Sequence, residues 1–166
     1  FGAEVMAHLF ALLDRPDVEA VALEVRLMAG TCAVAIGSAD LDLAARVDRL
    51  IERLSAWTAG SDNPRQPLVV QCMLALVLNR RWDFPRLHPL SRALVAAPII
   101  AADLRLYRGP VERLVFSKRA LGLSDFAVDD ALLADLEARL HAAGEVFNAL
   151  HVHANRACLA LNLGRP

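Results

Sequence analysis

The chain has 166 residues, of which 56% are hydrophobic, and a formal net charge of -1 at pH 7. This length suits one domain with a substantial core, and the charge-free stretches, such as 27–39 and 66–79, are too short to span a bilayer. We therefore expect a single domain over residues 1–166 with no membrane span, and residues 60–67 are the best candidate for an internal boundary.

The cysteines and the first residue indicate the setting of the chain. Cys32, Cys72 and Cys158 lie far apart in apolar segments, a pattern typical of buried, reduced and inert thiols rather than of a disulfide framework. The chain starts at Phe1 and shows no signal-peptide pattern. We expect a cytoplasmic protein of which this chain is a piece. Abundant alanine, with arginine strongly preferred over lysine, suggests a GC-rich, bacterial genome.

Hydrophobic spacing and turn residues predict helices along the whole chain. The clearest amphipathic pattern lies between Leu43 and Trp57, and the segment Leu68–Leu78 is apolar at every position except Gln71, as in a buried helix. Turns are expected at Trp82–Pro85 and at Gly109-Pro110, and the helix after the first turn is expected to begin only near Pro89, because proline disfavours a helix interior. The predicted helices are 4–13, 17–36, 39–57, 68–78, 89–97, 98–107, 110–121, 130–143 and 145–161.

The pattern therefore predicts an all-α fold, since no segment shows the sustained alternation of a β-strand. Helices joined by short turns are compatible with a right-handed stack of antiparallel hairpins, an α-solenoid, or with a compact helical bundle. The short turns favour the stack of hairpins.

Several segments resemble tetratricopeptide repeats, which are helix hairpins of about 34 residues. The run Ala93–Pro98, Ala-Leu-Val-Ala-Ala-Pro, matches the ending of such a repeat, and residues 157–164 resemble the end of a further first helix. The chain departs from the repeat at Leu74, where a glycine is expected, and at Arg86, where a small residue is expected. Over residues 66–164 the chain is similar to the helical arrays of large bacterial signal-transduction ATPases and of maltose-regulon-activator-like regulators. The resemblance implies binding of a protein partner or of a small-molecule inducer.

The middle of the chain is strongly basic. Residues 80–119 carry nine basic and three acidic side chains, between two segments with an excess of acid. Because arginine and aromatic residues dominate binding hot spots, we expect a recognition surface in this segment. A competing interpretation is that Trp82 and Phe84 only fill space between hairpins. The candidate binding residues are Arg80, Arg81, Trp82, Phe84, Arg105, Tyr107 and Arg108.

Other chemistries have weaker support in the sequence. His141, Glu145, His151 and His153 have metal-ligand chemistry, but residues two apart on a helix point to nearly opposite sides, so we expect no metal site there. Asp129 and Asp130 are expected to serve a helix start rather than acid–base work. No helix-turn-helix signature is evident, which makes a nucleic-acid partner unlikely, and no cofactor motif or catalytic residue is indicated.

The sequence thus predicts an interaction or sensor domain of a bacterial regulatory protein, binding a protein partner through a groove lined by residues 80–119. Self-association into a homo-oligomer is also open. The alternative is an all-α domain that binds or converts a small molecule in an apolar pocket beside helix 68–78. An enzyme is the less favoured class.

Overall fold

The computed structural model describes residues 41–162, together with His8 and Ala11. The chain divides into two compact units, Phe1–Trp82 and Asp83–Pro166, and each is treated by itself. The helices expected over 4–13 and 17–36 lie outside the described residues, apart from those two positions. The division falls between Trp82 and Asp83, whereas residues 60–64 form the loop that joins two helices inside the first unit.

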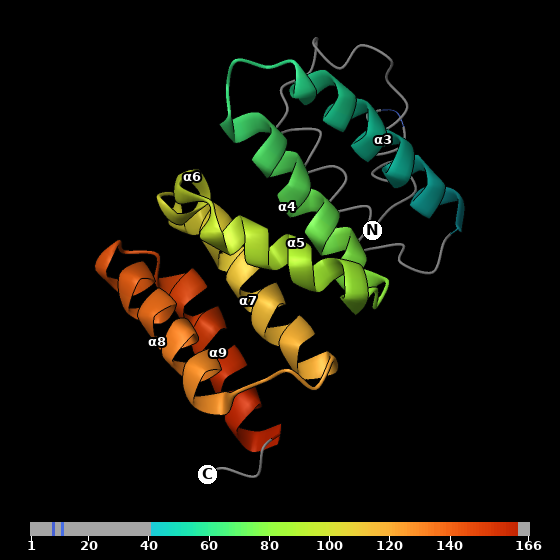
Figure 1. Cartoon of the computed structure of the whole chain (residues 1–166). Coiled ribbons are helices and arrows are strands. Elements are labelled where there is room, and N and C mark those ends of the chain that lie inside the picture. Colours follow the sequence, from blue (N-terminus) through green and yellow to red (C-terminus); the bar gives the residue numbers. More distant parts are fainter. Residues whose placement is uncertain (1–7, 9–10, 12–40, 163–166) are drawn as a thin grey trace. The chain divides into compact units, whose positions relative to one another are not determined.

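The described part of the first unit is a helix hairpin, α3 (Leu41–Ala59) and α4 (Arg65–Arg80) (Figure 1). The predicted amphipathic spacing of α3 is confirmed, because its apolar positions form the contact with α4. Helix α4 begins three residues before Leu68, since Pro67 lies in the first helical turn, where a missing N–H is tolerated. The core of the hairpin consists of Val47, Leu50, Ile51, Leu54, Val70, Met73 and Val77.

The second unit contains two further hairpins. Its helices are α5 (Phe84–Ala96), the short α6 (Pro98–Ala101), α7 (Leu104–Ala120), α8 (Phe126–Ala142) and α9 (Val146–Asn162). Helix α5 packs against α7, and α8 packs against α9 (Figure 1). Helix α7 also contacts α8 and α9, and so joins the two hairpins. The described residues therefore form seven helices and no strand, which confirms the all-α prediction for this part of the chain.

Two expectations that rest on proline are wrong, the start of a helix near Pro89 and the turn at Gly109-Pro110. Helix α5 starts at Phe84, five residues before Pro89, because the Asp83 side chain accepts a hydrogen bond from the Arg86 amide (3.3 Å) and caps the helix. Helix α7 runs unbroken through Gly109-Pro110. Buried residues on both sides of that pair, Tyr107 and Val111, lie one turn apart on one helix face, so packing holds the helix together across the missing hydrogen bond.

The start of α8 also differs from the prediction. The helix begins at Phe126 rather than at Asp130, because the Asp125 carboxylate accepts hydrogen bonds from the amides of Ala127 (3.0 Å) and Val128 (3.3 Å). This cap places Asp129 on the first turn of the helix, facing the core. Among the described residues, no helix combines the length and apolar character needed to cross a membrane.

Candidate functional site

The end of α4 holds three of the predicted binding residues, Arg80, Arg81 and Trp82, next to one another and exposed. Trp82 follows the last turn of α4 with a backbone φ of 59°, and its amide donates to the Asn79 carbonyl (3.2 Å). Its side chain is 71% exposed. We call these three residues the α4 end.

Trp82 occupies a position where two other helices of the chain have glycine. Gly122 after α7 (φ 71°) and Gly144 after α8 (φ 74°) close their helices in the same left-handed conformation. A side chain in that conformation costs about 1–2 kcal/mol relative to glycine. Among the described residues other than glycine, Trp82 is the residue with a positive φ. An exposed tryptophan is thus held where glycine would be less strained.

The charges of the α4 end are arranged by α3. Arg81 forms a two-pronged ion pair with Asp48, with its Nη1 and Nη2 atoms 3.0 and 3.1 Å from the two carboxylate oxygens. Both partners remain partly exposed, so this pair orients the Arg81 guanidinium rather than removing it from solvent. Arg80 is exposed in the last turn of α4, where a positive charge complements the helix dipole.

The four candidate binding residues of the second unit do not form one exposed patch. Phe84 is half-buried and meets Phe116 edge to face, with ring centroids 5.4 Å apart. Arg105 is largely exposed and pairs with Glu145 (2.7 Å), whereas Tyr107, two residues further along α7, is buried. Arg108 is half-buried. Within this unit, Arg105 is therefore the candidate that offers an exposed charge.

Tyr107 packs inside the second unit, against Arg139. Its ring lies under the guanidinium of Arg139 on α8, at 5.0 Å from the ring centroid. The same guanidinium donates a hydrogen bond from Nη2 to the Ala101 carbonyl (2.8 Å). Arg139 thereby links α8 with the last residue of α6, and Tyr107 lies beneath its guanidinium.

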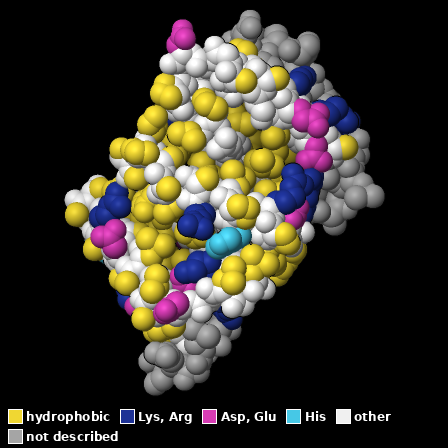
Figure 2. Space-filling view, viewed as in Figure 1, with side chains coloured by type: hydrophobic (Ala, Val, Ile, Leu, Met, Phe, Trp, Pro, Cys, Tyr) yellow, Lys and Arg dark blue, Asp and Glu magenta, His cyan; other side chains and the backbone are white. Residues whose placement is uncertain are grey.

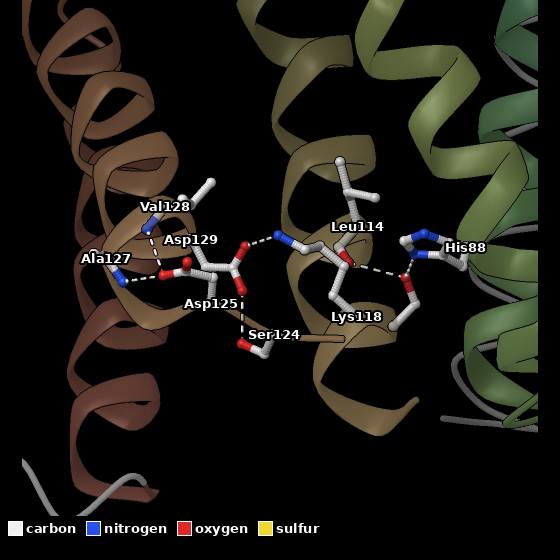
Figure 3. A network of polar contacts seen from close by, with 9 residues as sticks. His88, Leu114, Lys118, Ser124, Asp125, Ala127, Val128 and Asp129 are labelled. Atoms are coloured by element: carbon white, nitrogen blue, oxygen red, sulfur yellow. Dashed lines mark hydrogen bonds and ion pairs between the residues drawn. The ribbon is translucent and has the colours of Figure 1, made fainter. Parts of the chain in front are cut away.

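A buried polar network that the sequence did not predict joins α7 to α8 (Figure 3). The Asp129 side chain is completely buried, and its two oxygens accept from Lys118 Nζ and from Ser124 Oγ (2.6 Å). A serine nucleophile would need a neighbouring imidazole or amine base, yet the Ser124 hydroxyl donates to a carboxylate, which is a weak base. The network therefore supports a structural link across the turn between two helices rather than catalysis.

His88 on α5 is placed by a second polar contact shown in Figure 3. The Ser117 hydroxyl donates its single proton to the Leu114 carbonyl (2.9 Å), so it accepts from His88 Nδ1 (3.3 Å). This bond fixes the proton of His88 on Nδ1. It ties α5 to α7 at a half-buried position.

The histidines of α9 contact different helices. His151 Nδ1 donates to Glu112 of α7 (2.8 Å), and His153 Nδ1 donates to Glu137 of α8 (3.1 Å). The divergence of these two side chains agrees with the spacing argument made from the sequence. Within the described residues, no group of three or more His, Cys, Asp and Glu side chains is arranged to hold a metal ion.

Arg156 connects α9 to α8 through two carboxylates. It pairs with Asp130 through Nε (2.8 Å) and Nη2 (3.1 Å), and with Glu137 through Nη1 (2.8 Å). These hydrogen bonds from Arg156 are the main reason that the pKa values of Asp130 and Glu137 lie below their usual range, while partial burial acts in the opposite direction. Asp130 is therefore an ion-pair partner, a role that the sequence did not predict.

One thiol expectation also needs correction. Cys72 is half-buried on α4, but Cys158 is exposed on α9. The apolar neighbours of Cys158 suggested burial, yet they differ in burial themselves, because Leu159 is buried while Ala157 is exposed beside Cys158. Cys32 lies outside the described residues.

Comparisons of the chain with protein-family models, with curated proteins and with solved structures found no match. Within the predicted binding segment, Arg80, Arg81 and Trp82 lie exposed next to one another at the α4 end, whereas Arg105 is a single exposed and ion-paired charge in the second unit.

Proposed function

We propose that this chain is a protein-interaction domain that binds a partner through the α4 end, within a bacterial regulatory protein. The observation that carries the proposal is Trp82, exposed in a left-handed backbone conformation in place of glycine. Strained residues persist where surrounding structure holds them, and they often occur at functional sites. Tryptophan is also among the residues most enriched in binding hot spots.

The chemistry of the α4 end suggests the chemistry of its partner. An indole ring needs an apolar pocket to bury it, and the neighbouring Arg80 and Arg81 favour carboxylates around that pocket. The ion pair with Asp48 holds the Arg81 guanidinium in one orientation before binding, which lowers the entropy lost on association. The partner is thus expected to present an apolar pocket with an acidic rim.

A tetratricopeptide-like, right-handed stack belongs to the same proposal. Hairpins α3–α4, α5–α7 and α8–α9, each of neighbouring antiparallel helices, support it. The segment that resembles these repeats, residues 66–164, crosses the boundary between the two units. No specific observation favours the small-molecule alternative, because the buried apolar residues Val70, Met73 and Val77 of α4 pack against α3.

The proposal is tested by quantitative affinity capture from a lysate of the source organism. Trp82→Ala and Arg80→Glu should each reduce recovery of the same partner by at least about tenfold, the loss typical of a hot spot. Leu123→Ala is the matched control, because Leu123 is another exposed apolar residue (57%) but lies in the turn before α8.

Recovery of an unchanged set of proteins by Trp82→Ala, with its helical circular dichroism intact, would contradict the proposal. A second readout is available once a partner is captured. In a Trp57→Phe variant, indole fluorescence reports Trp82, and burial of this ring in a pocket should shift its emission to shorter wavelength.

A further inference from the structure

The side of α9 that faces away from α7 and α8 is apolar along the helix. Phe147, Leu150 and Leu161 on this side are exposed by 81%, 58% and 73%. Apart from its histidines, α9 has one ionisable basic residue, Arg156. Its side chain points to α8 and not to this outer side. We call this surface the α9 outer face; its exposed residues are Val146, Phe147, Leu150, Ala154, Ala157, Cys158 and Leu161.

Such a face is unusual for a helix that contacts solvent. Surface helices normally carry charged or polar residues on the side opposite the core. On the face of the molecule seen in Figure 2, basic and acidic side chains lie between the hydrophobic ones. A contiguous apolar surface of this kind typically marks an interaction site.

The spacing on the α9 outer face fits another helix. Positions 147, 150, 154, 157 and 161 follow one another at intervals of three and four residues. This is the spacing with which one helix packs side by side against another along a continuous seam. The expected occupant is therefore helical.

We propose that the occupant is α9 of a second copy of this chain, lying antiparallel, with the twofold axis beside Ala154. Phe147 and Leu161 lie seven residues on either side of Ala154. The axis therefore places Phe147 of one copy opposite Leu161 of the other. It also places Leu150 opposite Cys158.

Side-chain size supports this pairing. The residues around the axis, Ala154 and Ala157, are small and let the two helix backbones approach, while the large residues Phe147 and Leu161 fill the space at both ends. Leu150 meets the smaller Cys158, so large and small side chains alternate across the seam. Antiparallel helices also place opposite ends of their dipoles together.

The charge of the α9 outer face is compatible with a second copy. In a twofold interface a surface patch faces itself, so a charge near the axis would meet an equal charge. Within residues 146–161 the α9 outer face has no Asp, Glu, Lys or Arg. At its borders, His151 and His153 are already held by Glu112 and Glu137 of their own copy.

The size of the face sets the expected strength. A helix of this length is about 25 Å long and about 10 Å wide, which gives a footprint of about 250 Å². Stable complexes bury about 800 Å² on each partner, and smaller interfaces are typical of reversible encounters. The dimer should therefore be weak and form reversibly.

Sedimentation of the full chain over a range of concentrations tests the proposal. The mass of the wild type should rise from 18.0 kDa toward twice that value. Leu150→Glu should raise the dissociation constant at least about tenfold, since it places a charge in the seam. Leu123→Glu is the matched control, because Leu123 is exposed to the same extent (57% against 58%) but lies outside the α9 outer face. A wild type that stays monomeric, or equal effects of the two substitutions, would overturn the proposal.

Disulfide trapping tests the antiparallel arrangement. In a background of Cys32→Ser, Cys72→Ser and Cys158→Ser, Ala154→Cys should form linked dimers on mild oxidation, whereas Phe147→Cys alone should not. Combining Phe147→Cys with Leu161→Cys should restore linkage, and only between copies, because these positions are about 21 Å apart on one helix. Equal linkage through Phe147→Cys and Ala154→Cys would show parallel helices. Absence of linkage through Ala154→Cys, as expected for an unrelated partner, would also refute the proposal.

Discussion

Lys118 on α7 forms an ion pair with Asp129 on α8, and the side chain of Asp129 is completely buried. The second oxygen of that carboxylate accepts from Ser124, so both oxygens of Asp129 have a partner. The pair spans the turn that Gly122 closes, where the Leu123 amide donates to the Lys118 carbonyl (2.7 Å). Backbone and side-chain contacts of Lys118 thus hold the same turn.

Asp129→Ala should destabilise the protein strongly. Removing one member of a buried pair leaves the other charge without compensation, at a cost of about 3–5 kcal/mol. Lys118 keeps 21% of its side chain exposed and can hydrate in part, so we expect about 2–4 kcal/mol. Urea unfolding followed by circular dichroism measures the loss.

The double variant Lys118→Met with Asp129→Leu distinguishes a lost charge partner from lost packing. It should recover most of the stability, since apolar pairs of similar volume often replace buried ion pairs without loss. Asp135→Ala is the control, because Asp135 is 64% exposed and pairs with Arg139 at 3.6 Å, and should cost about 0.5 kcal/mol or less. A loss at Asp129 as small as that at Asp135 would show that the buried pair does not stabilise the fold.

Trp82→Gly should not destabilise the first unit. Glycine relieves the left-handed strain of about 1–2 kcal/mol, and its greater freedom in the unfolded chain offsets about 0.5–1 kcal/mol of that gain. The net change should lie between zero and about 1.5 kcal/mol in favour of the folded state. Thermal unfolding of Trp82→Gly and Trp82→Ala, the latter retaining the strain, measures the difference. A lower melting temperature for Trp82→Gly than for Trp82→Ala would contradict this account of the α4 end.

Arg156→Gln should lower stability at neutral pH but not in strong acid. The hydrogen bonds from Arg156 hold the pKa values of Asp130 and Glu137 below the ordinary 3.8 and 4.5. A carboxyl group with a lowered folded-state pKa stabilises the protein above its unfolded pKa, and this contribution disappears as the pH falls through the folded value. The wild type should therefore exceed the variant by about 1–3 kcal/mol above about pH 5, with the difference shrinking below pH 4.

Denaturant unfolding between pH 2 and pH 7 measures this pH dependence, with the exposed Arg92→Gln as control. Arg92→Gln should give a nearly constant, small difference from the wild type. If the effect of Arg156→Gln is the same at both ends of the pH range, then the carboxylates of α8 do not mediate it.

The sequence predicts best those elements whose stabilising contacts lie along one helix face. Helices α3 and α9 are confirmed because regular apolar spacing continues through them. Three boundaries are wrong. Capping by Asp83 and by Asp125 starts α5 and α8 earlier than the sequence pattern predicts. Buried residues around Pro110 keep α7 continuous where proline predicts a turn. The pairing of Lys118 with Asp129 depends on the geometry of a turn, which spacing does not reveal.

The candidate site shows the same limit. Arg105 and Tyr107 were grouped because they are close in sequence, but residues two apart on a helix point in different directions, and one is exposed while the other is buried. Helical periodicity alone could have separated them. For Trp82 the sequence offered no signal of its backbone conformation, because tryptophan rarely takes the position of a closing glycine.

Pro89→Ala should stabilise the second unit. Pro89 lies inside α5 and is exposed, while the residues that anchor the helix, Leu87 and Leu94, are completely buried. Proline in a helix interior costs about 3 kcal/mol relative to alanine, because it removes one hydrogen bond and crowds the preceding turn. Proline also stiffens the unfolded chain, which offsets about 0.4–1 kcal/mol, so a net gain of about 2–2.6 kcal/mol is expected. Thermal unfolding should show a melting temperature several degrees higher than that of the wild type.

Pro85→Ala is the control, because Pro85 lies in the first turn of α5, where the backbone N–H has no partner within the helix. This substitution should change the melting temperature little. Equal gains at both positions would mean that the interior position of Pro89 does not strain α5.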